Sequence, residues 1–153
     1  MNLLEIRNRI REVALSVSLS YSEIEGLKDT NELLNQTMPC LMWRYDNESG
    51  DFDTDTQIIC DFYFLNNWHE SQLNETAEYQ RDYVITEQSK LREFFKEFAE
   101  NVSVECGSKY FELKSWTAIP IEERISIEGF ITINFRCTFR KSNDFCIKIS
   151  ECE

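Results

Sequence analysis

Glycine and proline are scarce in this sequence of 153 residues, which contains four glycines and two prolines. Flexible linkers, collagen-like repeats and low-complexity segments are rich in these residues, so all three classes are excluded. Long apolar runs are absent as well, and no stretch approaches the roughly 20 residues of a membrane-spanning helix. The first ten residues include Glu5, Arg7 and Arg9 and lack the apolar region of a secretory signal. We therefore expect no membrane partner and a chain that stays in the cytosol.

Positive charge is the next shortage. Lys and Arg number 16 against 28 Asp and Glu, which gives a formal net charge of −12 at pH 7. Proteins that bind nucleic acids or anionic membranes need a basic surface, so neither partner is expected. A hydrophobic fraction of 42% with 13% aromatic residues excludes a disordered chain.

Residues that carry chemistry are few. His69 is the only histidine, there is no Cys-x-x-Cys pair, and the four glycines are scattered singly. The run Asp51-Phe52-Asp53-Thr54-Asp55 resembles the start of a calcium loop. Thr56, however, stands where that loop needs glycine, and Phe62 stands where it needs glutamate. We interpret the run as a solvated hairpin tip and predict no catalytic residue, no cofactor and no metal site, hence no enzyme.

The cysteines are six, an even number that invites a disulfide interpretation. Their apolar, strand-like surroundings are typical of buried free thiols, and the cytosol keeps thiols reduced. We therefore expect free thiols at Cys40, Cys60, Cys106, Cys137, Cys146 and Cys152.

Apolar residues that recur every three or four positions predict two helices. The first is an amphipathic N-terminal helix over residues 3–21. The second is a long inner helix over residues 86–100, with Thr86 as its N-cap, or with a start as early as Thr76.

Runs of β-branched and aromatic residues predict the strands. A hairpin spans residues 40–65, with a long acidic loop that begins at Asp46. Its second strand is apolar on both faces and should lie inside the sheet. Later strands are expected at 109–117, 129–140 and 144–150. The whole chain, residues 1–153, is thus predicted to be a single α+β domain, with a largely antiparallel sheet of four to five strands packed with the two helices.

Aromatic residues are abundant: eleven Phe, six Tyr and three Trp. Tyr and Trp combine an apolar body with a polar tip and are enriched where proteins bind one another. The candidate interface comprises such residues and the acidic loop, namely Trp43, Tyr45, Asp51, Asp53, Asp55, Tyr63, Trp68 and Trp116. The same aromatic side chains would also serve as core and rim of a lone monomer, and the sequence leaves both interpretations open.

Three segments carry a resemblance to a known family: Ile58 to Leu65 before a polar connection, the helix around Leu91 to Phe98, and the late strand from Gly129 to Phe135. In this order of elements the chain resembles the tail terminator or tail-completion proteins of tailed bacteriophages. The resemblance implies a structural subunit that forms a homo-oligomeric ring at the head–tail neck or tail. It also implies contact with other virion proteins, and a place in the virion after assembly in the host cytoplasm. No individual residue role is carried over.

Two hypotheses follow, and an enzyme with an unfamiliar site, which a ligand pocket with convergent polar groups would reveal, is a third option. In a ring around a DNA passage, excess carboxylate repels phosphate, and closure needs a contact between two different patches, here the aromatic strand faces and the acidic hairpin loop. The alternative is a small acidic protein of the immunity or antitoxin type that neutralises a basic partner. Its interface would be Asp46 to Asp55 together with Glu70 to Asp82.

Overall fold

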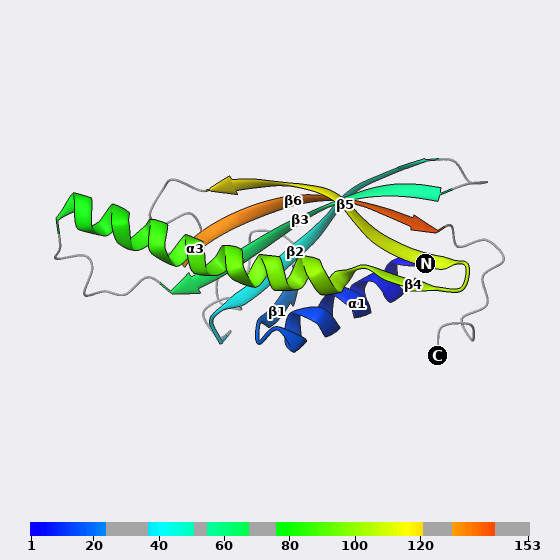
Figure 1. The fold of residues 1–153 in the computed structure, drawn as a ribbon, viewed down its shortest axis with the longest axis horizontal. Coiled ribbons are helices and arrows are strands. Elements are labelled where there is room, and N and C mark those ends of the chain that lie inside the picture. The colour runs from blue at the N-terminus through cyan, green and yellow to red at the C-terminus, as the bar shows by residue number, and fades with distance from the viewer. Residues whose placement is uncertain (24–36, 51–54, 68–75, 121–129, 143–153) are drawn as a thin grey trace.

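The computed structural model describes residues 1–23, 37–50, 55–67, 76–120 and 130–142. In this part of the chain, two helices pack against one face of a six-stranded, strongly twisted sheet (Figure 1). The predicted α+β class is confirmed. The sheet, however, has six strands and is mixed, whereas four to five antiparallel strands were expected. Neither described helix combines the length and the apolarity that crossing a membrane would require.

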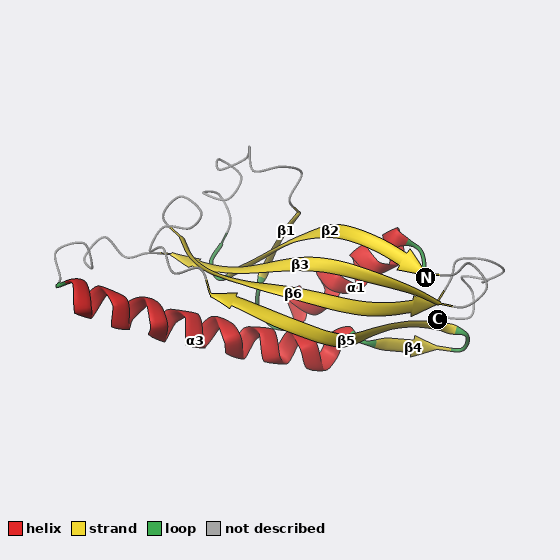
Figure 2. Cartoon of the chain, turned by 90° about the horizontal axis from the view of Figure 1, so that it is seen from above, coloured by secondary structure: helices red, strands yellow, loops and turns green. Residues whose placement is uncertain are grey.

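The strands lie in the order β1-β2-β3-β6-β5-β4 (Figure 2). Their bounds are β1 Ser20–Glu23, β2 Cys40–Gly50, β3 Asp55–Asn67, β4 Val104–Cys106, β5 Lys109–Pro120 and β6 Phe130–Ser142. Strand β1 pairs with β2 in parallel, and every other pair is antiparallel. Strand β3 is hydrogen-bonded on both sides, in keeping with the interior position that its two apolar faces predicted.

Helix α1 spans Leu3–Ser16 and is shorter than the predicted helix over 3–21. Asn2 and Glu5 form a capping box at its start. At its end Ser18 takes a left-handed conformation with φ 66°, and the amide N–H groups of Ser18 and Leu19 donate to the carbonyl oxygens of Leu15 and Ala14. This is a Schellman stop, after which the chain enters β1, so Tyr21 belongs to a strand.

Helix α3 spans Ala77–Val102, so the earlier of the two predicted starts is correct. Thr76 is the N-cap, and its hydroxyl oxygen accepts from the N–H of Tyr79 at 3.2 Å. Thr86, the other candidate, lies inside the helix and donates its hydroxyl to the carbonyl of Asp82.

The acidic loop of the hairpin begins later than predicted. Strand β2 continues to Gly50, and Asp46 sits in a β-bulge between Tyr45 and Asn47. Strand β6 likewise runs on to Ser142, two residues beyond the predicted end at residue 140. The predicted strand at 144–150 lies outside the described residues. Strands β1 and β4 were not predicted, because four and three residues are too short for a periodic signal.

The core lies between the helices and the sheet. The alternation predicted for the late strand is confirmed, since the odd-numbered residues from Ile131 to Phe139 are all buried in this core. Strand β5 departs from simple alternation, because the register shifts between Leu113 and Ser115. This bulge turns Trp116 toward the helices, where its ring contacts Phe95.

Ser18 offers a test of the helix stop. A left-handed backbone costs a residue with a Cβ about 1 kcal/mol, whereas glycine adopts it without this cost. We expect Ser18→Gly to raise the free energy of unfolding by about 0.5–1 kcal/mol and Ser18→Val to lower it, as measured by urea denaturation. Equal stability of the glycine variant and the parent would contradict the assigned geometry.

Candidate functional site

The face of the sheet opposite the helices carries a charged cluster. The Asp61 carboxylate, whose side chain is 3% exposed, accepts hydrogen bonds from Arg44 at 3.1 and 3.2 Å and from Arg136 at 3.2 and 3.3 Å. Arg136 also pairs with Asp46 at the β2 bulge. Two carboxylates thus meet two guanidinium groups, so the acids of this cluster are neutralised within the chain and do not form a bare acidic surface.

A second charged cluster ties α1 to the ends of the strands. Lys109, whose side chain is 2% exposed, lies 3.0 Å from Glu5, and Lys141, 5% exposed, lies 3.3 Å from Glu48. Burial alone would raise the pKa of Glu5, but the hydrogen bonds from Lys109 and from the Asn2 N–H outweigh it, and the pKa is lowered. The pKa of Glu48 is also lowered, first by the hydrogen bond from the Tyr45 hydroxyl and then by Lys141.

The thiols of the described residues are free, as predicted, at Cys40, Cys60, Cys106 and Cys137. Burial raises the pKa of Cys40 and of Cys60 to about 12 and raises that of Cys137 as well. These three thiols therefore stay protonated at neutral pH and are poor nucleophiles. The described residues contain no group of three or more His, Cys, Asp or Glu side chains that would hold a metal ion.

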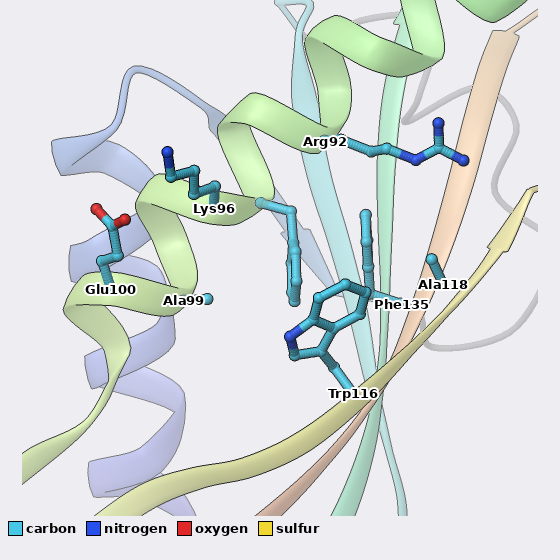
Figure 3. Close-up of a pocket in the computed structure, with 8 residues that line it drawn as sticks. Arg92, Lys96, Ala99, Glu100, Trp116, Ala118 and Phe135 are labelled. Carbon is cyan, nitrogen blue, oxygen red and sulfur yellow. The ribbon is translucent and has the colours of Figure 1, made fainter.

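A pocket of about 450 Å³ lies between α3 and β5, and we call it the α3–β5 groove (Figure 3). It is lined by five residues of α3, two of β5 and one of β6, namely Arg92, Phe95, Lys96, Ala99, Glu100, Trp116, Ala118 and Phe135. Ala99 and Ala118 contribute little more than a methyl group each, so the facing helix and strand leave space between them. The bulge in β5 supplies Trp116 to this space.

Three aromatic rings form the wall of the groove. Phe95 of α3 stacks on Phe135 of β6, with ring centroids 3.7 Å apart and planes 6° from parallel. Trp116 stands edge-on to both rings, at centroid distances of 5.2 and 5.9 Å. Phe95 and Phe135 are buried, whereas Trp116 is 53% exposed. The wall is thus a rigid apolar surface with one large aromatic ring open to solvent.

The rim of the groove is charged. Arg92 and Lys96 are one helical turn apart on α3, and both are exposed. Neither forms an ion pair within the described part of the chain, and Glu100 follows them one turn later. The lining therefore combines an apolar wall with two cations and one carboxylate, an arrangement suited to binding.

The predicted interface residues that the structure describes are spread over different parts of the fold. Trp43 is 5% exposed, and its indole N–H donates to the Tyr21 hydroxyl at 2.7 Å, so within one chain it is a core residue. Tyr45 is half-buried beside that core, and half-buried Tyr63 lies on the opposite face of the sheet with Asp61. Asp55 begins β3, and Asp51, Asp53 and Trp68 lie outside the described residues. Among those of the eight whose side chains the structure describes, Trp116 alone lines the groove.

Sequence reasoning missed the rest of the groove. Arg92 and Lys96 are charged positions between the apolar residues of the inner helix, and nothing in the sequence indicated which strand lies beside them. The comparisons with protein-family models and with curated protein sequences find no match for this chain. The geometry of the groove is therefore the basis for a functional proposal.

The Glu5–Lys109 pair gives a prediction for stability. Glu5→Gln leaves a buried lysine without its carboxylate, so we expect the free energy of unfolding at pH 7 to fall by about 3 kcal/mol in urea denaturation. The double variant Glu5→Gln, Lys109→Met removes both charges and should recover part of this loss. A single variant as stable as the parent would show that the pair contributes nothing.

The same pair, with Glu48, gives a prediction for pH. The folded-state pKa values of Glu5 and Glu48 both lie below the ordinary 4.5. Each carboxylate therefore contributes stability that is complete above pH 4.5 and is lost as the pH falls further. The parent should therefore lose stability more steeply below pH 4.5 than Glu48→Gln does, in urea denaturation at a series of pH values. Parallel curves would contradict this.

Proposed function

We propose that this protein is a structural subunit that acts by binding other protein chains. Its own copies would form a ring of the tail terminator or tail-completion type, at the neck or tail of a tailed bacteriophage. The protein would then reside in the virion, assembled in the host cytoplasm around the DNA passage, and would contact other neck or tail proteins.

The observation that carries this proposal is the α3–β5 groove with its exposed Trp116. Tryptophan side chains over well-packed apolar pockets dominate the binding energy of protein interfaces. The groove is also one-sided: it lies beside β5, near one edge of the sheet, while β1 and the neighbouring helix α1 form the other edge. In a head-to-tail contact such a patch meets a different patch on the next copy, which is the arrangement that builds rings, whereas two copies that met through the same patch would form a closed dimer.

The charge of the chain supports the same proposal. A net charge of −12 repels the phosphate backbone, so a ring of such subunits would let DNA pass without binding it. The sequence offered the alternative of an acidic inhibitor of a basic partner. Asp46, the first residue of the segment that this alternative would use, is already paired with Arg136. Asp61, beside that segment in the sheet, is paired with Arg44 and Arg136.

Native mass spectrometry of the purified chain tests the ring. We expect one closed oligomer of fixed copy number, and we expect Trp116→Ser to shift it to monomers because the exposed ring is lost from the contact. Tyr79→Ser is the matched control, since Tyr79 on α3 is 50% exposed and lies outside the groove. This control should assemble like the parent.

A parent that remains monomeric at its highest soluble concentration would contradict the ring. Tight, salt-sensitive binding of that monomer to a basic protein would instead favour the acidic inhibitor. Circular dichroism of each variant shows whether a loss of assembly reflects a loss of fold.

A further inference from the structure

The α3–β5 groove specifies the chemistry of its occupant. Its wall of Phe95, Phe135 and Trp116 suits a large apolar side chain. Its rim holds two cations, Arg92 and Lys96, without an ion pair in the described residues, and one carboxylate, Glu100, a turn further along α3. The matching occupant is an aromatic side chain flanked by carboxylates.

This chain contains such a sequence. Between β2 and β3 stands Asp51-Phe52-Asp53, an aromatic residue between two carboxylates. We propose that the groove of one copy binds the Asp51-Phe52-Asp53 tip of a second copy, with Phe52 against the aromatic wall and the two aspartates at Arg92 and Lys96. The inference rests on the proposed function, because it names the two surfaces that would meet in the ring.

The tip cannot reach the groove of its own chain. Gly50 pairs with Thr56, and Asp55 pairs with Ser142 at the end of β6, whereas Trp116 pairs with Cys137 of the same strand. Asp55 and Trp116 are therefore separated by five residues along β6 and by two strand spacings across the sheet, a distance of about 20 Å. Phe52 is two residues beyond Gly50, and two extended residues span about 7 Å at most. A tip that fills the groove must therefore come from another copy.

The contact is heterologous, because the tip and the groove are different surfaces of each copy. Every copy then offers one tip and one groove, and successive contacts either close into a ring or continue as a filament. The cations and carboxylates make the contact dependent on salt, which a purely apolar contact is not.

Three variants test the contact by native mass spectrometry. Phe52→Ser removes the apolar group of the tip, and Arg92→Glu with Lys96→Glu reverses the charge of the rim at two exposed positions. We expect each to yield monomers. Combining the rim reversal with Asp51→Lys and Asp53→Lys should restore assembly, because the charges are then exchanged. Leu4→Ser with Leu15→Ser is the control, since these leucines on α1 are 59% and 56% exposed and offer the competing apolar surface.

A mixture separates this proposal from a general loss of assembly. Phe52→Ser copies keep an intact groove, and rim-reversed copies keep an intact tip. Mixed together, they should form a one-to-one heterodimer with a single contact and no ring. If the parent forms a ring that persists in Phe52→Ser and in the rim reversal, the proposed docking is wrong although the ring is real. If only the leucine variant loses assembly, the contact between copies is made by α1 and not by the groove.

If the parent is a monomer, the proposed function is wrong, and a peptide then tests the docking by itself. A synthetic peptide of residues 49–57 is titrated into the Phe52→Ser protein by isothermal calorimetry. We expect saturable binding that weakens at least about tenfold with the rim reversal, and equally with the peptide carrying Phe52→Ser. Absence of binding would overturn the docking as well.

Discussion

The packing of α3 on the sheet is the interaction on which the other features depend. Phe95 and Phe98 of this helix meet Phe62 and Phe64 of β3, and Phe95 also stacks on Phe135 of β6. Each buried phenylalanine contributes about 1.5–3 kcal/mol by leaving water. These contacts fix the height of the helix above β6 and β5, and the groove is the space that the same helix leaves at the edge of this packing.

Charge is distributed unevenly over the molecule, and this gives the groove its character. The buried or half-buried ions of the described residues are matched: Asp61 with two arginines, Glu5 with Lys109, and Glu48 with Lys141. Most other carboxylates whose exposure is described lie on exposed positions, where repulsion is screened and weak. Arg92 and Lys96 stand beside the apolar wall without an ion pair in the described residues, and this suits the groove to an occupant that carries carboxylates.

Much of the fold followed from residue patterns. The stripe around Phe95 and Phe98 predicted the inner helix, and the alternation from Ile131 to Phe139 predicted β6 with the correct face buried. Errors arose where a local stop decided the outcome. Ser18 ends α1 through a left-handed backbone that glycine usually supplies, and the bulge at Asp46 lets β2 continue through residues typical of a turn.

The groove shows where sequence reasoning stops. By itself the sequence determined the class of the fold, the acidic character of the chain, the faces of the long elements and Trp116 as a candidate contact, because these depend on composition and on periods of two and 3.6 residues. Only the tertiary structure decided that Trp43 is buried and Trp116 exposed, and that Arg92 and Lys96 lie over the same wall. These facts depend on strand order and on a one-residue bulge in β5, and neither leaves a trace in local periodicity.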